Sequence, residues 1–232
     1  MNNRYGKLFG VSVGPGDPEL LTLKAVRVLN SCSAIAVPET KLGNTVALQI
    51  IENVIDLSGK QIIRLPFRMS RDPEVLIKSH EEQALMLLNI LKNGNDAAMI
   101  SLGDISIYST FGYIAKLVEN EGCEVERVSG VPSFCECACR LGMSLTEMNL
   151  PIHILPSRCV NEETLLQLPG SKVIMKDASG FFAIKKILRE KGFHAAAVTN
   201  CGLPNEKIYQ DFNDLPDQPA YFTTIIVPAQ NI

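Results

Sequence analysis

Short apolar runs alternate with amphipathic stretches along the chain, and this alternation limits the possible folds most strongly. Residues 7–14, 33–39 and 96–104 have the pattern of buried strands, and residues 19–32 and 72–94 have the pattern of amphipathic helices. Strands separated by helices favour parallel pairing, because a parallel connection needs a long crossover. The sequence therefore predicts an α/β fold whose mostly parallel sheet is covered by helices on both faces.

The pattern becomes less regular in the last third of the chain. Strands are expected at 151–156, 171–177, 195–200, 207–212 and 223–228, with helices at 161–168 and 181–192. The last two strands have no helix between them, which favours antiparallel pairing. We therefore expect two domains, residues 1–148 with a mostly parallel sheet and residues 149–232 with a mixed sheet.

Charge and cysteine content narrow the function classes. The chain has 22 Lys and Arg against 25 Asp and Glu, a formal charge of −3, which argues against a nucleic-acid partner. It contains no apolar run of about 18 residues that would span a membrane, and its start lacks the apolar region of a signal peptide. Seven cysteines, an odd number, fit a reducing compartment better than a disulfide framework. We expect a cytoplasmic protein without membrane partners.

A glycine loop follows the first predicted strand. In VGPGDPELL, residues 13–21, Asp17 occupies the place of a helix cap and Pro18 that of the first helical residue. Such a loop lets the backbone approach a ligand, although a well-capped turn looks the same. No Lys-Ser or Lys-Thr follows, so it is not a P-loop. Glu19 replaces the third glycine of a dinucleotide fingerprint, but Glu39 stands where a ribose-binding acid would, so a nicotinamide dehydrogenase remains an alternative.

Four segments together resemble the motifs of the tetrapyrrole methyltransferases of the cobalamin and sirohaem pathways, which use S-adenosylmethionine. They are VGPGDPELLTLKA (13–25), SLGDISIYST (101–110), VSGVPSF (128–134) and VIMKDAS (173–179), in the family's order. The resemblance implies two αβα domains with the cofactor between them, and a homodimer. It also implies which residues contact the cofactor: Pro15, Leu102, Gly103, Asp104, Ile107, Ser133, Phe134, Met175 and Cys201.

Two further segments, residues 37–51 and 103–114, resemble the C(20)-methyltransferases of that family. This resemblance implies methyl transfer to carbon 20 of cobalt-factor II, with metal-free precorrin-2 or another target carbon as alternatives. Two residues depart from the family pattern. Ile105 stands where the family commonly has proline, and Cys201 where relatives often have glycine. A sensor domain that keeps the cofactor site without chemistry is a non-enzyme alternative.

Three cysteines in GVPSFCECACRLG (130–142) suggest a metal site at first sight. At about 100° per residue, Cys135 and Cys139 share one helix face and Cys137 points roughly opposite, so the three cannot converge on one ion. Glu136 and Arg140, four residues apart, can form an ion pair. We therefore expect no metal, and interpret the cysteines as compact buried residues that let the helix pack closely.

No obvious catalytic set is present, which is consistent with methyl transfer. The sulfonium of the cofactor is already electrophilic, so orienting the reactants is the main task. Asp104 and Tyr108 are candidates for a base, although capping and packing roles are favoured for them. A substrate rich in carboxylates requires local cations. Arg64, Arg68 and Arg71 follow a strand in RLPFRMSRDP (64–73), and Arg158 and Lys176 are weaker candidates.

Overall fold

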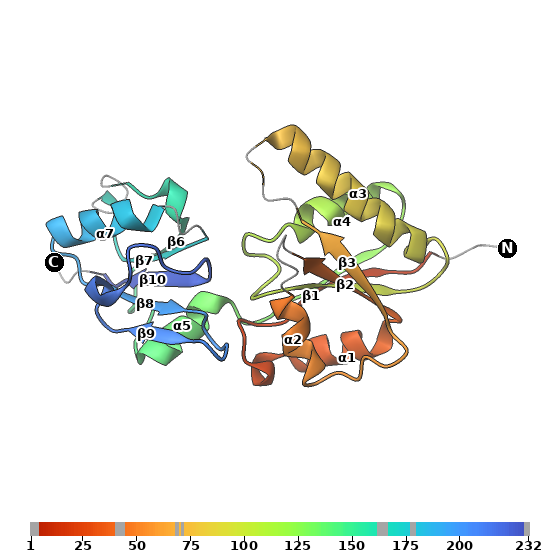
Figure 1. The fold of residues 1–232 in the computed structure, drawn as a ribbon, viewed down its shortest axis with the longest axis horizontal. Coiled ribbons are helices and arrows are strands. Elements are labelled where there is room, and N and C mark those ends of the chain that lie inside the picture. Colours follow the sequence, from red (N-terminus) through yellow and green to blue (C-terminus); the bar gives the residue numbers. More distant parts are fainter. Residues whose placement is uncertain are drawn as a thin grey trace. The chain divides into compact units, whose positions relative to one another are not determined.

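The chain forms two compact units (Figure 1). The computed structural model describes residues 5–39, 45–67, 70, 72–161, 167–176 and 180–229. The units are Met1–Pro132 and Ser133–Ile232. Helix α5, Ser133–Leu141, thus belongs to the second unit, whereas the boundary expected after residue 148 assigns it to the first domain. The reason is packing, because Cys137 and Leu141 of α5 share a core cluster with Val198 and Ile226 of the second sheet.

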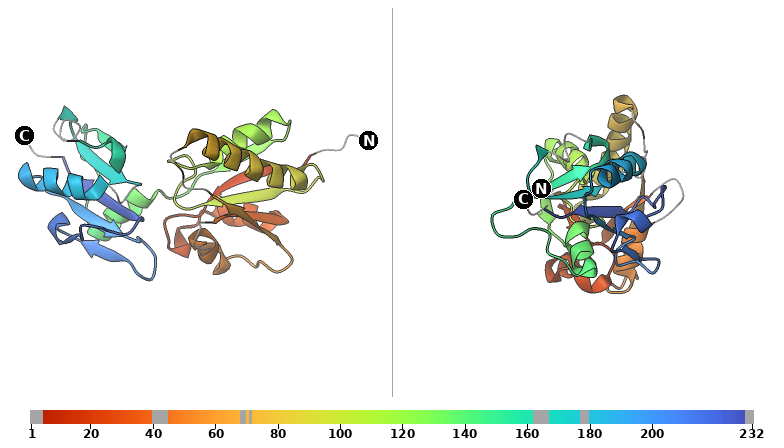
Figure 2. Two further views of the ribbon diagram at one scale, coloured as in Figure 1. Left: turned by 45° about the horizontal axis from the view of Figure 1, so that its top comes forward. Right: turned by 90° about the vertical axis from the view of Figure 1, so that its left-hand side faces the viewer.

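The first unit is a five-stranded parallel sheet, as the sequence predicts. Its strands are β1 Leu8–Ser12, β2 Ala34–Glu39, β3 Gln61–Pro66, β4 Ala97–Ser101 and β5 Val125–Val128, in the order β3-β2-β4-β1-β5. Its helices are the 3-10 helix η1 Pro18–Leu20, α1 Leu23–Ser31, α2 Val46–Glu52, α3 Pro73–Leu91 and α4 Phe111–Asn120. Figure 2 shows α3 and α4 on one face of the sheet and α1 and α2 on the other, and each face has its own apolar cluster.

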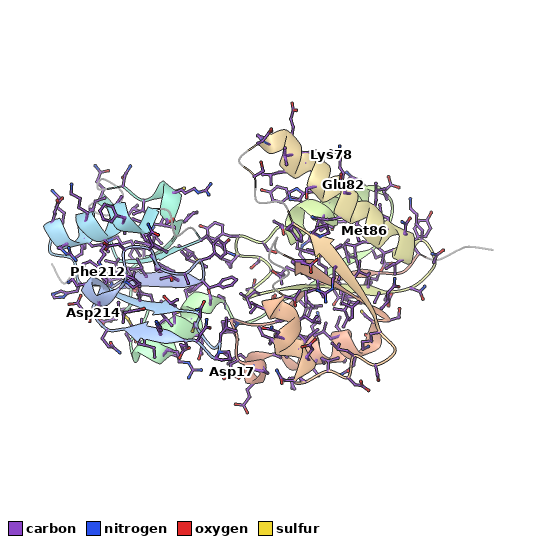
Figure 3. The ribbon with its side chains drawn as sticks, in the orientation of Figure 1. Asp17, Lys78, Glu82, Met86, Phe212 and Asp214 are labelled. Carbon is purple, nitrogen blue, oxygen red and sulfur yellow. The ribbon has the colours of Figure 1, made fainter. Side chains whose placement is uncertain are left out.

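Helix α3 shows how the sequence pattern becomes a two-sided element. Lys78, Glu82 and Met86 are spaced four residues apart and lie exposed along one side of the helix (Figure 3). Leu87 and Leu91 are fully buried on the side that faces the sheet. The exposed and buried sides alternate with the periodicity of a helix, which predicts this element from sequence.

The start of α1 differs from the sequence expectation. Asp17 does accept a hydrogen bond from Glu19 N at 2.9 Å, but it caps the short η1 helix. Helix α1 begins at Leu23, where Thr22 Oγ1 accepts a hydrogen bond from Ala25 N at 3.1 Å. The glycine loop and the first long helix are therefore separated by a 3-10 turn.

The second unit contains a mixed five-stranded sheet in the order β6-β7-β10-β8-β9. Its elements after α5 are β6 Ile152–Pro156, the 3-10 helix η2 Ser157–Cys159, β7 Ser171–Met175, α7 Phe181–Glu190, β8 Ala196–Thr199, β9 Lys207–Tyr209, the 3-10 helix η4 Phe212–Asp214 and β10 Thr223–Val227. The last two strands, β9 and β10, take part in antiparallel pairing, as expected. They do not pair with each other, however, because each of them pairs with β8. The helix predicted at 161–168 falls largely outside the described residues.

The cysteines of α5 follow the predicted helical geometry but differ in burial. Cys137 is 1% exposed, Cys135 is partly buried, and Cys139 is exposed. The expectation that all three pack in the core is therefore wrong for Cys139, because the face it shares with Cys135 turns outward. The predicted ion pair is confirmed, with Arg140 Nε 2.9 Å from Glu136 Oε1. Within the described ranges, no three His, Cys, Asp or Glu side chains are grouped to hold a metal ion.

The described parts of both units contain no helix that is long and apolar enough to cross a bilayer.

The packing of α5 predicts unequal effects of cysteine substitution. Cys137→Ala should lower the free energy of unfolding by about 1 kcal/mol, because it leaves a small cavity in the core. Cys139→Ala should change it by less than about 0.5 kcal/mol, as is usual at an exposed position. Urea unfolding followed by circular dichroism measures both values, and equal effects of the two substitutions would contradict this packing.

Candidate functional site

Three loops of the first unit leave one edge of the parallel sheet. They follow β1, β4 and β5, which are neighbours in the order β4-β1-β5. Because parallel strands end on the same side, residues 13–17, 101–108 and 129–132 come together at the carboxyl edge, where α/β sheets bind ligands. These loops are the first three motifs of the sequence, and we call them loops 1, 2 and 3.

Loops 1 and 2 are joined by a pair of backbone hydrogen bonds. Gly14 N donates to Gly103 O at 3.2 Å, and Gly103 N donates to Gly14 O at 2.7 Å. Gly14 has φ +75° and Gly103 has φ +72°, a region that residues with a Cβ atom rarely adopt. The two motif glycines therefore make a contact that other residues would strain.

Asp104 joins loop 2 to loop 3. Its Oδ2 accepts a hydrogen bond from Gly130 N at 2.7 Å. Its Oδ1 accepts one from Ser106 N at 2.8 Å and another from the hydroxyl of Ser106. The side chain is buried, so both carboxylate oxygens are used within the protein.

Strand β1 also contacts loops 2 and 3, through its last residue, Ser12. Ser12 is fully buried, and its Oγ accepts a hydrogen bond from Ile105 N at 2.8 Å. A Cβ atom on Gly130 would lie 2.5 Å from the Cβ atom of Ser12, so loop 3 packs directly on the end of β1. Ile105, which departs from the family's proline, is buried in the core and leaves its N–H available for this bond.

The electrostatics of Asp104 favour a charged, structural carboxylate. Burial tends to raise the pKa of this side chain, but the hydrogen bonds from Ser106 and Gly130 outweigh burial and hold the pKa below its ordinary value. A carboxylate with a low pKa and no vacant oxygen is a poor proton acceptor. This geometry favours a positioning role over the role of base that the sequence left open.

The other cofactor candidates of the first unit lie on loops 1 and 2. Pro15 is buried and Leu102 is partly buried. Ile107 is partly buried, and its N–H donates to Asp104 O at 3.2 Å. Tyr108, the second candidate base, is 46% exposed and has φ +48°. The structure therefore brings the first-unit candidates together on two connected loops.

The remaining cofactor candidates belong to the second unit. Ser133 and Phe134 begin α5, Met175 ends β7, and Cys201 follows β8. Strands β7 and β8 are both antiparallel to β10, so they run in the same direction and end at the same edge of the sheet. Met175 and Cys201 thus lie at one sheet edge, 7% and 6% exposed. A hydrogen bond with Cys137 and burial raise the pKa of the Cys201 thiol, which keeps it neutral.

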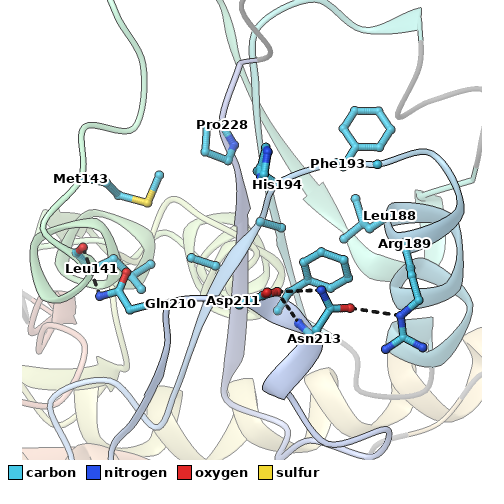
Figure 4. Close-up of a pocket in the computed structure, with 14 residues that line it drawn as sticks. Leu141, Met143, Leu188, Arg189, Phe193, His194, Gln210, Asp211, Asn213 and Pro228 are labelled. Atoms are coloured by element: carbon cyan, nitrogen blue, oxygen red, sulfur yellow. Dashed lines mark hydrogen bonds between the residues drawn. The ribbon is translucent and has the colours of Figure 1, made fainter.

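A pocket of about 520 Å³ opens at the other side of the second sheet, where β8 begins (Figure 4). It is lined by residues at the start of β8 and the end of β10, and by Arg189 and Asn213. Arg189 Nε donates to Asn213 Oδ1 at 3.0 Å, and Asn213 N donates to Asp211 Oδ1 at 2.8 Å. No residue that the sequence singled out as a cofactor contact lines this pocket, and these polar groups already bind one another.

The cationic candidates differ in their surroundings. Arg64 Nη1 lies 2.9 Å from Glu39 Oε1, so its charge is already paired. Arg68 and Arg71 fall outside the described residues. Arg158 is exposed in η2, and Lys176 directly follows β7.

The structure also weakens the dehydrogenase alternative. The carboxylate of Glu39, the expected ribose ligand, binds Arg64. The order β3-β2-β4-β1-β5 is not the 3-2-1-4-5 order of the dinucleotide fold, and α1 does not begin at the glycine loop.

Sequence reasoning missed the residues that hold the loops in place. Ser106 stands two residues after Asp104, which is the spacing of an Asx turn and could have revealed the contact. Ser12 is a small polar residue within an apolar strand, and Gly130 shows no sequence sign of its bond to Asp104.

The low pKa of Asp104 predicts a pH-dependent effect on stability. Asp104→Asn should lower the free energy of unfolding by about 1–3 kcal/mol at pH 7, because it disturbs charge-assisted hydrogen bonds. The folded-state pKa lies below the unfolded value of about 3.9, so this stabilisation is complete above that value and disappears as the pH falls through the folded-state pKa. The difference between wild type and variant should therefore shrink below about pH 4.

Urea unfolding at pH 7 and in acid measures this difference. Glu52→Gln is the control, because Glu52 is exposed on α2 in the same unit. A difference between Asp104→Asn and wild type that is the same at both pH values would contradict the role given to the carboxylate.

Comparison with known proteins agrees with this geometry. The sequence model of one protein family, the tetrapyrrole (corrin/porphyrin) methylases, matches residues 7–214 of this chain. The chain is 31% identical over 236 residues to the cobalt-precorrin-2 C(20)-methyltransferase of Salmonella typhimurium, covering 97% of each protein. It is 42% identical over 157 residues to a Methanocaldococcus jannaschii protein named "probable cobalt-precorrin-2 C(20)-methyltransferase", covering 67% of this chain and 66% of that protein.

A solved structure shows the same fold. Uroporphyrin-III C-methyltransferase from Thermus thermophilus, in complex with S-adenosylhomocysteine, superimposes with a TM-score of 0.69 at 20% identity, covering 96% of this chain and 97% of that one. The family model matches most of the chain, and the motif loops are joined to one another in the structure. This protein therefore belongs to the tetrapyrrole methylases.

Proposed function

We propose that this protein transfers a methyl group from S-adenosylmethionine to carbon 20 of the cobalt-containing substrate, cobalt-factor II or cobalt-precorrin-2, in cobalamin biosynthesis. Both relatives described above carry the cobalt-precorrin-2 C(20) name, and one of them aligns over almost the whole chain. Metal-free precorrin-2 is the nearest alternative substrate, and a different target carbon is the next.

One observation carries the proposal at the level of the site. Loops 1, 2 and 3 are distant in sequence but are joined through Gly14, Gly103, Asp104 and Gly130 at the carboxyl edge of one sheet. The two glycines without Cβ atoms leave the backbone open to a close neighbour. This arrangement fits a cofactor held by backbone and apolar groups, which is what the motif residues offer.

The proposed division of labour follows from these contacts. S-adenosylmethionine supplies an electrophilic methyl group when it is bound. The cofactor contacts of the first unit are Pro15, Leu102, Gly103 and Ile107. The hydrogen bonds of Asp104 hold loops 2 and 3 in position. We also assign cofactor contacts to four residues of the second unit, as the family resemblance implies: Ser133, Phe134, Met175 and Cys201. Fixing the reactants in this way contributes through orientation rather than through an acid or a base.

The proton lost from the substrate carbon needs an acceptor. Tyr108 remains a candidate, because its strained φ of +48° and its exposure place it on the surface of loop 2. Asp104 is the weaker candidate, because both of its oxygens already accept hydrogen bonds.

Cations near the site would bind the substrate carboxylates. Arg68 and Arg71 remain proposals from their position after β3. Arg64 would first have to release Glu39, so we expect the smallest contribution from it. We further propose a cytoplasmic homodimer, on the basis of the family resemblance and the seven cysteines, which are free thiols in the structure.

The proposal predicts that Gly103→Arg abolishes binding of S-adenosylhomocysteine, because a long side chain would occupy the cofactor's space. Gly59→Arg is a matched control, since Gly59 has φ +75° with nothing within 4 Å of an added Cβ atom. Both variants carry similar backbone strain, so only the lost site should separate them. Calorimetric titration measures affinity, and Gly103→Arg binding like Gly59→Arg would contradict the assignment of loop 2.

Turnover identifies the substrate. The wild-type protein should methylate cobalt-factor II faster than metal-free precorrin-2, with product mass and position established by mass spectrometry and NMR. Binding of S-adenosylhomocysteine without turnover of any tetrapyrrole would favour the sensor alternative. Binding of NAD in place of S-adenosylhomocysteine would favour the dehydrogenase.

A further inference from the structure

Lys176 stands in an unusual place for a lysine. It directly follows β7, whose last residue is the cofactor candidate Met175, and it has φ +66°. This left-handed conformation is disfavoured for any residue with a Cβ atom, and lysine has no local hydrogen bond that compensates for it. Observed backbone strain of this kind is a reason to look for a function.

Strand β8, which is separated from β7 by β10 and runs in the same direction as β7, ends in the same way. Asn200 directly follows β8 and has φ +54°, and its N–H donates to Phe222 O at 2.8 Å. Asparagine tolerates this conformation far better than lysine does. Two parallel-running strands thus turn sharply at one sheet edge, and Lys176 occupies the turn where a more permissive residue would be expected.

The ammonium of Lys176 is partly withdrawn from water without a counter-charge. The residue is partly buried, and within the part of the chain that the structure describes no acceptor or carboxylate is paired with it. Burial lowers the pKa of this ammonium from its ordinary value. Such a charge gains from an incoming anion more than an exposed lysine would.

The two other buried lysines of this unit are satisfied. Lys172 Nζ donates to Gly170 O at 2.8 Å. Lys185 Nζ donates to Leu215 O and lies 3.3 Å from Asp217 Oδ1. Among the residues that the structure describes, Lys176 therefore differs from both in having no bonding partner.

We infer that Lys176 binds a carboxylate of a ligand next to Met175, at the side of the second sheet where β7 and β8 end. The inference rests on the proposed function, which provides two sources of that group: a side-chain carboxylate of the tetrapyrrole, and the carboxylate at the methionine end of the cofactor. In both cases Lys176 is a binding residue that acts through charge.

The test compares three variants with wild type. Lys176→Met removes the charge, Lys176→Arg keeps it, and Lys176→Gly removes it while relieving the backbone strain. Lys186→Met is the control, because Lys186 is exposed on α7 and its loss changes the net charge equally. Calorimetric titrations use S-adenosylhomocysteine as one probe and cobalt-factor II as the other, at low and high salt.

Lys176→Met and Lys176→Gly should weaken binding of one probe about ten- to a hundredfold, the size of a lost charge-assisted contact. The probe that is affected identifies the source of the carboxylate. Lys176→Arg should lose less, Lys186→Met should stay within about twofold, and the wild-type affinity should fall more with salt than that of Lys176→Met. Without ligand, Lys176→Gly should unfold at the same or a higher urea concentration than wild type.

Three results would overturn the inference. One is binding of both probes by Lys176→Met and Lys176→Gly within about twofold of wild type. Another is an equal loss of both probes, which would indicate a structural role. The third is that the wild-type protein binds neither probe. This result would overturn the proposed function as well, whereas the first two results would overturn only the inference about Lys176.

Discussion

The buried carboxylate of Asp104 is the contact on which the site depends most. It joins loop 2 to loop 3 through Gly130, while Gly103, the preceding residue, joins loop 2 to loop 1 through Gly14. Gly103 and Asp104 therefore connect loop 2 to one segment about ninety positions earlier in the chain and to another about twenty-five positions later. Removing water from a charged group is costly unless hydrogen bonds replace it, and here three do so.

Each connection depends on the strand order. Placing β1 between β4 and β5 brings the three loops to one edge, and the small residues Ser12 and Gly130 allow loop 3 to lie directly on β1. A methyl group at Gly130 would collide with β1, so this position has little freedom to vary. Gly130 therefore has a structural role in addition to its place in the candidate site.

Much of this could be predicted from the sequence, because its signals are local. The alternation of apolar runs and amphipathic helices indicated the α/β class, and helical geometry correctly placed Cys137 opposite Cys135 and Cys139. Which strand pairs with which was not predictable, because β10 lies between β7 and β8 through contacts that are distant in sequence. The exposure of Cys139, the pairing of Arg64 with Glu39 and the left-handed turn at Lys176 depend equally on tertiary surroundings. The identity of the methyl acceptor came from resemblance, since substrate recognition leaves no periodic pattern.

The central claim is that loops 1, 2 and 3 form one cofactor-binding unit, and hydrogen–deuterium exchange with S-adenosylhomocysteine tests it most directly. Backbone amides in residues 13–17, 101–108 and 129–132 should exchange more slowly when the wild-type protein is saturated with the ligand, and all three segments should respond over the same range of ligand concentration. Saturated binding with unchanged exchange in these segments, or protection confined to the pocket lined by Arg189 and Asn213, would contradict the account.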